Sequence, residues 1–322
     1  MSEETEFGNG ELLPAEGDTS RLEAFLPTDN VQNHAANLLP LPNGDLLCVW
    51  FSGTQEGMSD ISVYSARLMA GSERWSDLRK LSEDSTRSEQ NPVLFLAPSG
   101  ALWLFWTSQK AGNQDSAVVM RRISNDNGAT WGPIEVFIDT PGTFVRQPII
   151  VLDNGDWLLP VFYCVPVPGK KWVGDKDYSA VKISSDQGKT WTEVAVPGST
   201  GCVHMNIEKL DDGSLVAVFR SRWADHIYRT QSDDGGLTWQ TPQPTVLPNN
   251  NSSVQALRLA DGRLAMIFNA SSAANATERR ESLYDELEDT GEGAQGATVA
   301  APAARKAFWG APRAPMTLAL SA

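Results

Sequence analysis

Five copies of one pattern run along the chain, and this repetition constrains the fold more than any other feature of the sequence. Each copy has an alternating apolar run, a tight turn that closes on a glycine, and a second apolar run. The turn glycines are Gly44, Gly100, Gly155, Gly213 and Gly262, at intervals of 56, 55, 58 and 49 residues. Asn-Gly and Asp-Gly favour the positive φ of a two-residue hairpin. Each repeat is therefore predicted to begin with a β-hairpin.

A second motif, S-x-D-x-G-x-T-W, follows three of the hairpins. Its copies begin at Ser124, Ser184 and Ser232. Asp and Ser can bond nearby backbone N–H groups, Gly supplies a positive φ, and Trp fills the space between strands. The motif is expected to join the third strand of each unit to the fourth. In the first repeat only Trp75 of this pattern is left.

The spacing of these motifs predicts an all-β fold. Four strands in about fifty residues, with an aromatic motif in each unit, are typical of a β-propeller. A β-sandwich is the alternative, but sandwiches do not repeat one hairpin-plus-turn module at a nearly constant period. The length of 322 residues by itself would suggest two ordinary domains, and the repeats favour one repeat domain instead.

The S-x-D-x-G-x-T-W motif resembles the Asp box of sialidases (neuraminidases) and related BNR-repeat proteins, and the resemblance covers about residues 20–322. It implies a six-bladed β-propeller. Blades are expected at about 33–83, 90–138, 146–197, 203–247 and 252–322, the last incomplete. Ser321 aligns with the first position of a fifth box, so the sixth blade and part of the fifth are expected to be missing. Asp boxes also occur in other propellers, so they indicate architecture more than chemistry.

Two segments fall outside the repeats. Residues 1–19 are acidic and are predicted to form a flexible arm. Residues 270–312 interrupt the fifth repeat with a charged, helix-like part at 278–288 and a Gly/Ala-rich part at 289–304. The latter is expected to be disordered. This insertion is either a lid over the site or a solvated insertion, and the flank 306–313 is expected to be more ordered.

The charge balance excludes several partners. With 40 acidic and 26 basic residues, the net charge of −14 would repel nucleic acid and anionic lipid. A hydrophobic content of 41% is enough to build a core. No apolar stretch is long enough to span a membrane, and the N-terminus has no signal-peptide pattern. The expected location is therefore the cytoplasm.

The cysteines and histidines indicate no metal site. Cys48, Cys164 and Cys202 lie far apart and beside apolar runs, so they are expected to be small buried residues. No metal or other cofactor is predicted, although a structural Ca²⁺ in Asp-rich loops stays open. No pattern indicates an oligomeric state.

Polar residues recur where each innermost strand is expected to begin. In a propeller these positions and the loops between second and third strands lie on one face. The strand-entry candidates are His34, Gln90, Asn91, Arg146, Gln147, His204, Asn206 and Asn251. The loop candidates are Asp60, Gln114, Asp115, Asp175, Asp177, Arg220, Arg222 and Arg313. Arginines bind carboxylates and amides bind hydroxyls, so the set suits an acidic sugar, although turn chemistry also explains single amides.

Histidine placement adds to this prediction. The chain has three histidines, and His34 and His204 fall at the same phase of the repeat, which favours a functional role for both. His226 is expected at the surface.

The resemblance to sialidases implies roles for some of these residues. Asp60 matches the general acid/base, with a turn residue as the alternative, and Arg220 and Arg313 match two of three carboxylate-binding arginines. His34 stands where the family has the first arginine, and His204 where it has a glutamate. The family's nucleophilic tyrosine belongs to the expected missing blade. Losing one arginine costs about 1.5–3 kcal/mol of carboxylate binding, so the substrate can differ from sialic acid.

The function implied is that of a sialidase-like exo-glycosidase that hydrolyses a terminal acidic sugar from a glycoconjugate. Asp60, His34 and His204 would be catalytic, since a histidine can also take up a phenol proton near neutral pH. The alternatives are a hydrolase or lyase for a different sugar with histidine as the base, and a non-catalytic carbohydrate-binding propeller. The expected partner in each case is a carbohydrate.

Overall fold

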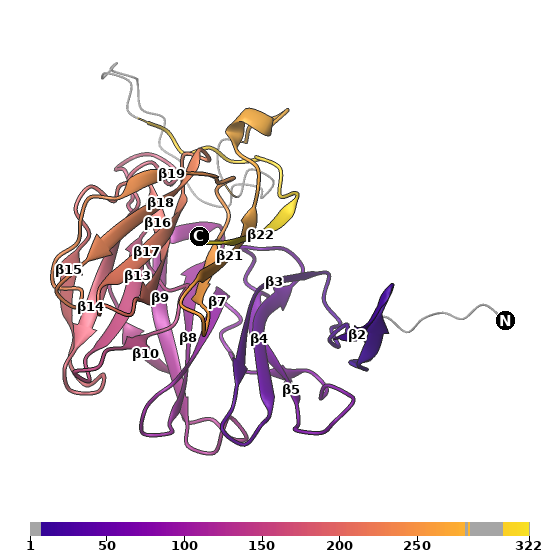
Figure 1. Ribbon diagram of the computed structural model, residues 1–322. Coiled ribbons are helices and arrows are strands. Elements are labelled where there is room, and N and C mark those ends of the chain that lie inside the picture. Colours follow the sequence, from indigo (N-terminus) through magenta and orange to yellow (C-terminus); the bar gives the residue numbers. More distant parts are fainter. Residues whose placement is uncertain (1–7, 281–282, 284–304, 322) are drawn as a thin grey trace. The chain divides into compact units, whose positions relative to one another are not determined.

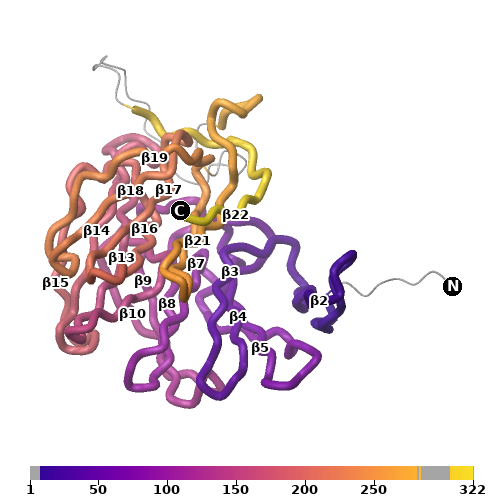
Figure 2. Tube along the Cα trace, in the orientation of Figure 1, coloured from indigo at the N-terminus to yellow at the C-terminus, as the bar shows by residue number. Residues whose placement is uncertain are grey.

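The computed structural model describes residues 8–280, 283 and 305–321, and these residues form an all-β fold, as predicted. Figures 1 and 2 trace this chain. By contacts it divides into two compact units. The first unit is Met1–Asn113 with Ala117–Asp139, and the second is Gln114–Ser116 with Thr140–Ala322. One short 3-10 helix, η1 (Ala273–Asn275), interrupts the strands of the described part.

The first unit holds two four-stranded antiparallel sheets in which each strand pairs with its neighbour in sequence. One sheet consists of β3 (Gln32–Pro40), β4 (Leu46–Gly53), β5 (Ser62–Leu68) and β6 (Arg79–Lys80). The other consists of β7 (Arg87–Leu96), β8 (Leu102–Lys110), β9 (Asn113–Ser124) and β10 (Glu135–Ile138), with residues 114–116 of β9 counted in the second unit. Sheets of this order are the blades of a propeller.

The second unit holds three further antiparallel sheets. The first has β11 (Thr143–Phe144), β12 (Ile150–Val151), β13 (Trp157–Tyr163), β14 (Tyr178–Ser184) and β15 (Thr192–Ala195). The next has β16 (Cys202–Lys209), β17 (Leu215–Ser221), β18 (His226–Ser232) and β19 (Gln243–Pro248). The last has β20 (Gln255–Arg258), β21 (Leu264–Asn269) and β22 (Met316–Leu320). In the first of these sheets the innermost strand is split, because β11 and β12 pair with the two ends of β13.

The five predicted hairpins are confirmed. Each turn glycine has a φ between 84° and 87°, in the left-handed region where residues with a Cβ are strained. The turns join β3 to β4, β7 to β8, β12 to β13, β16 to β17 and β20 to β21.

The three S-x-D-x-G-x-T-W motifs form the predicted turns between third and fourth strands. In the first, Asp126 accepts hydrogen bonds from the Thr130 N–H at 2.8 Å and from the Thr130 hydroxyl at 2.5 Å. The Ser124 hydroxyl accepts the Gly128 N–H at 2.7 Å. The same bonds recur around Asp186 and Asp234. The side chains of the serine, the aspartate and the threonine therefore bond within the motif itself.

These turns predict a specific acid sensitivity. Hydrogen bonds from the threonines lower the pKa of Asp126 and of Asp186 to about 2. Because the folded pKa lies below the unfolded one, both carboxylates stabilise the fold above about pH 4 and lose this effect as pH falls toward about 2. The double variant Asp126→Asn, Asp186→Asn should therefore lose less thermal stability than the wild type between about pH 5 and pH 2.5. Melting curves across this range test it, and equal losses would refute the assignment.

Packing between neighbouring sheets forms the core inside each unit. In the first unit, Val49 and Val63 of the β3–β6 sheet pack with Leu104 and Trp106 of the β7–β10 sheet. In the second unit, Leu158 and the β13–β15 sheet pack with the β16–β19 sheet in the same way. The three cysteines are buried and unpaired, as expected.

The segments outside the repeats differ from expectation in part. Residues expected in a flexible arm form a hairpin of β1 (Leu13–Ala15) and β2 (Asp18–Glu23), because Gly17 has the positive φ that the turn needs. The predicted disordered stretch 289–304 and most of the helix-like stretch 278–288 lie outside the described residues. The flank is packed into the second unit, with Trp309 2% exposed.

Candidate functional site

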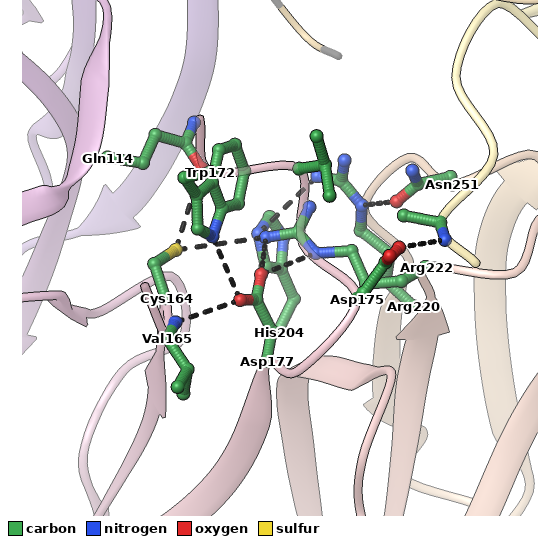
Figure 3. A network of polar contacts seen from close by, with 12 residues as sticks. Gln114, Cys164, Val165, Trp172, Asp175, Asp177, His204, Arg220, Arg222 and Asn251 are labelled. Carbon is green, nitrogen blue, oxygen red and sulfur yellow. Dashed lines mark hydrogen bonds and ion pairs between the residues drawn. The ribbon is translucent and has the colours of Figure 1, made fainter. Parts of the chain in front are cut away.

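The site with the most concentrated charge lies in the second unit, at one end of the β16–β19 sheet. His204 lies near the start of β16, and Arg220 lies at the end of β17, the strand that pairs with β16. His204 has a φ of +55° at a register shift between Val203 and Asn206. Such a β-bulge re-aims a side chain, which here brings the imidazole to the arginine. Figure 3 shows these residues together.

A buried ion pair forms the base of the site. Arg222 is 2% exposed and Asp177 is fully buried. The Arg222 Nε and Nη2 atoms lie 2.9 Å and 2.8 Å from Asp177 Oδ2. The other carboxylate oxygen accepts the Trp172 indole N–H at 3.0 Å and a backbone N–H at 3.1 Å (Figure 3). Every polar bond that a buried carboxylate requires is thereby present, and the pair is structural.

Arg220 contacts Asn251 and His204 through its guanidinium. Its Nε donates to Asn251 Oδ1 at 2.7 Å, and its Nη1 lies 3.5 Å from His204 Nε2 (Figure 3). Since a guanidinium can only donate, Nε2 of His204 accepts, and the imidazole proton is placed on Nδ1. Nδ1 then donates to the Ser253 hydroxyl. This tautomer follows from the donors and acceptors present.

The electrostatics of the site keep His204 neutral. Burial lowers the pKa of His204 well below its usual range, and the charges of Arg220, Arg222 and Arg146 lower it further. An imidazole with these surroundings is a weak base while no anion is present. An anion bound among these arginines would cancel part of the repulsion and raise the pKa of His204.

Arg146 is a half-buried charged group of the second unit. It lies in the gap between β11 and β12, where the innermost strand of its sheet is interrupted. Burial lowers the pKa of Arg146 to about 10. Within the part of the chain that the structure describes, its guanidinium has no hydrogen-bond or ion-pair partner. A half-buried guanidinium without a partner favours a bound anion, so Arg146 is compatible with the predicted binding role.

Two other predicted binding residues use their amides inside the fold. Gln147 is buried and donates to the Val254 carbonyl at 3.2 Å. Asn206 is buried and accepts the Ala256 N–H at 2.5 Å, which ties β16 to β20. Asn206 thus joins neighbouring sheets of the second unit, while Gln147 joins the segment between β11 and β12 to the residue that precedes β20.

The two candidates in the β7–β10 sheet also have structural roles. Gln90 is fully buried and donates to the Ser88 hydroxyl at 3.0 Å. Asn91 has a φ of +52° at a register shift between Gln90 and Val93. Asparagine tolerates this left-handed conformation better than most residues, which explains its place at the bulge.

Asp60 and His34 belong to the first unit. Asp60 lies in the turn that enters β5, and its Oδ2 accepts the Thr54 N–H at 2.8 Å. His34 stacks on Phe51, with ring centroids 5.4 Å apart, and lines a cavity of about 370 Å³ with Trp50 and Cys48. Their catalytic roles stay predictions.

The predicted equivalence of His34 and His204 is wrong. The left-handed bulge residue of β3 is Ala35, with a φ of +55°, and in β16 it is His204 itself. His34 therefore lies one residue earlier in the repeat. Because successive side chains of a strand alternate in direction, a shift of one position changes the surroundings of the side chain.

The Arg313 side chain makes no contact with His204, Arg220 or Arg222 among the described residues. Its side chain is exposed and has no partner among the described residues, while its backbone carbonyl accepts the Asn269 amide at 2.9 Å. It precedes β22, the third strand of its sheet, where the resemblance placed the third arginine.

Comparison with known proteins identifies the family. A family model described as a BNR repeat-like domain matches residues 44–322, which is most of the chain. The chain belongs to this family. The BNR-repeat assignment made from the three boxes is thus confirmed. No curated protein sequence matches the chain.

Solved structures extend the comparison of this BNR repeat-like protein. A Hadza microbial sialidase has a TM-score of 0.60 at 14% identity, over 75% of this chain and 53% of that one. The NanB sialidase of Streptococcus pneumoniae has a TM-score of 0.61 at 12% identity, over 78% and 59%. The intramolecular trans-sialidase of Ruminococcus gnavus has a TM-score of 0.60 at 14% identity, over 78% and 80%. The structural similarity establishes a sialidase-like fold. At identities this low it establishes the fold alone.

The sequence patterns missed part of the site in this BNR repeat-like protein. Arg222 and Asp177 were placed among loop residues, but no pattern indicated that they form a buried pair. Trp172 and Trp309, which lie 6.0 Å apart, were not assigned to the site. The signal available was a tryptophan beside charged residues in two loops, which is not specific. No helix in the described residues is long and apolar enough to cross a membrane.

Proposed function

We propose that this protein is a sialidase-like exo-glycosidase that binds a terminal acidic sugar and cleaves it from a glycoconjugate. One observation carries the proposal: Arg146 is a half-buried guanidinium without a partner among the described residues, and its charge acts on His204, whose Nε2 lies 3.5 Å from Arg220 Nη1. In a chain of net charge −14 this is a local positive site. A carboxylate can accept two parallel hydrogen bonds from a guanidinium, so the group recognised would be the sugar's carboxylate.

The chemistry of the proposal follows from the resemblance. Asp60 would donate a proton to the leaving oxygen and then act as base toward water, as in retaining glycosidases. His204 would accept at Nε2 the phenol proton of the tyrosine nucleophile, once the bound carboxylate has raised the pKa of His204. The tyrosine nucleophile that the resemblance implies belongs to a sixth blade. Apart from the β1–β2 hairpin, five sheets occur among the described residues, so that blade remains part of the proposal.

A second candidate function is carbohydrate binding without catalysis. His204 stands at the position of the family's glutamate, and burial together with three arginine charges keeps it neutral. A neutral imidazole that already accepts a hydrogen bond from Arg220 is suited to shaping a binding site. The neutral state of His204 favours the binding function, because a neutral, hydrogen-bonded imidazole is a weak base.

Turnover of fluorogenic glycosides tests the proposal. The 4-methylumbelliferyl glycosides of sialic acid, of uronic acids and of a neutral hexose would be compared at equal concentration. The proposal predicts release from a sugar with a carboxylate and none from the neutral hexoside, and loss of release in Asp60→Asn with sugar affinity retained. Binding of the acidic sugar without any release would favour the second candidate. Neither binding nor release would refute both.

A further inference from the structure

A short segment of the predicted insertion is buried against the candidate site. We call Ala307–Pro312 the strap. Ala307, Trp309 and Ala311 of the strap are between 2% and 7% exposed. The sequence interpretation of this region left a lid and a solvated insertion open. Burial of three alternate residues shows that the strap packs in a fixed place in the second unit.

Hydrogen bonds tie the strap to the loops of all three sheets of its unit. The Ala307 N–H donates to Asp175 at 2.6 Å (Figure 3), and the Phe308 N–H donates to the Arg222 carbonyl at 2.8 Å. At its far end, the Asn250 amide donates to the Pro312 carbonyl at 2.7 Å. The strap thus spans the loops that carry Asp175, Arg222 and Asn250.

Two of its residues contact the surroundings of Arg220. The Arg220 guanidinium lies over the Trp309 ring, 5.6 Å from its centroid, which is within the range of a cation–π interaction. The Phe308 carbonyl accepts the Asn251 side-chain amide at 2.9 Å. The same Asn251 side chain accepts from Arg220 Nε at 2.7 Å. Arg220 is therefore linked to the strap through a ring and through an amide.

Trp309 is itself fixed by groups outside the strap. Its indole N–H donates to the Val173 carbonyl at 3.0 Å, and its ring meets Trp172 edge-on at 6.0 Å. Arg222, held by the buried Asp177, lies 5.1 Å from the Trp309 centroid. The ring cannot shift without breaking one of these contacts. Because the Trp309 ring contacts both guanidinium groups, the place of Arg222 in the buried ion pair helps to fix the place of Arg220.

We propose that the strap positions Arg220 for carboxylate binding, with Trp309 and Asn251 as positioning residues. The proposal rests on the proposed function, in which Arg220 contacts the sugar's carboxylate. What it adds is that the Trp309 ring and the Asn251 amide hold the Arg220 guanidinium in place. Pre-organisation of this kind raises affinity because fewer side-chain conformations are lost on binding.

A measurement on the unliganded protein tests the placement itself. The Nε–H signal of Arg220 would be assigned in ¹⁵N-edited NMR spectra by its loss in Arg220→Lys. In the wild type and in Trp309→Phe, which keeps an aromatic face, the signal should be sharp and protected from exchange. In Trp309→Leu and Asn251→Ala it should broaden or exchange faster. An unchanged signal in both of these variants would overturn the proposal.

Sugar affinity provides the second readout, with a matched control. Trp223 lies 5.6 Å from the Arg305 guanidinium, the same separation as in the Trp309 and Arg220 pair, and it belongs to the same loop as Arg222. Trp309→Leu should weaken binding of N-acetylneuraminic acid about 3- to 30-fold, the range that a cation–π contact spans. Trp309→Phe should restore most of it, and Trp223→Leu should leave the affinity unchanged even if it lowers the melting temperature.

The two readouts separate the possible failures. If the wild type binds no acidic sugar, the proposed function fails and the Arg220 signal alone decides on the strap. If the wild type binds and Trp309→Leu binds equally well, the strap has no positioning role. Equal losses in Trp309→Leu and Trp223→Leu would show a general loss of stability and would also overturn the proposal.

Discussion

Replacing Arg222 with alanine is expected to lower the free energy of unfolding by about 3–5 kcal/mol, because the buried Asp177 would lose its counter-ion. Both side chains are at most 2% exposed, and the carboxylate is out of reach of water. Three aromatic rings, those of Phe162, Trp172 and Trp309, also lie within 5.8 Å of the Arg222 guanidinium. Removal of the arginine therefore also leaves a gap among these rings.

Denaturant unfolding measures this effect, and the chain offers a matched control. Arg21 pairs with Glu23 at 2.8 Å, but these side chains are 62% and 54% exposed. Arg21→Ala should cost less than about 1 kcal/mol, since exposed pairs are screened by solvent. Equal costs for Arg222→Ala and Arg21→Ala would contradict the assignment of the buried pair as the base of the site.

The second large effect is expected at Arg146. Arg146→Ala should weaken binding of N-acetylneuraminic acid about 10- to 150-fold, which corresponds to the loss of one charge-assisted contact of about 1.5–3 kcal/mol. The same variant should raise the pKa of His204, because the charge of Arg146 is one of the causes that lower it. The sign is fixed by charge alone, since removing a nearby cation favours the protonated imidazole.

Calorimetric titration and NMR of the His204 ring check these two outcomes. Arg229→Ala is a suitable control, because Arg229 is an exposed arginine of the sheet that carries His204. Its guanidinium contacts Gln231. This variant should leave both affinity and the pKa of His204 unchanged. An Arg146→Ala protein with wild-type affinity would remove Arg146 from the site.

Local features of the fold were predictable because they depend on residues close in sequence. A glycine in a two-residue turn needs a positive φ, and the hydrogen bonds of an S-x-D-x-G-x-T-W motif close within seven residues of its serine. The β-bulges were less accessible. Their positions depend on the pairing of two strands, so the left-handed residue is Ala35 in β3 and His204 in β16, although His34 and His204 were predicted to share one phase of the repeat.

The candidate site was predictable only in part, since its contacts join distant segments. Arg146, Arg220, His204 and Asn251 were all expected from their place in the repeat, and the structure links the last three by hydrogen bonds. Trp309 and Arg220, which are in contact, are 89 positions apart in the sequence, and Trp309 belongs to the insertion, which lies outside the repeats. No periodicity can indicate such a contact, because it depends on how the strap packs.

The most direct test of the central claim, that this arginine cluster binds the carboxylate of an acidic sugar, compares two ligands in two proteins. N-acetylneuraminic acid and its methyl ester, which differ in one negative charge, would be titrated into the wild type and into Arg146→Ala. The account predicts that the wild type binds the acid at least about tenfold more tightly than the ester. It also predicts that Arg146→Ala loses most of this difference. Equal affinities in the wild type, or an undiminished preference in the variant, would contradict it.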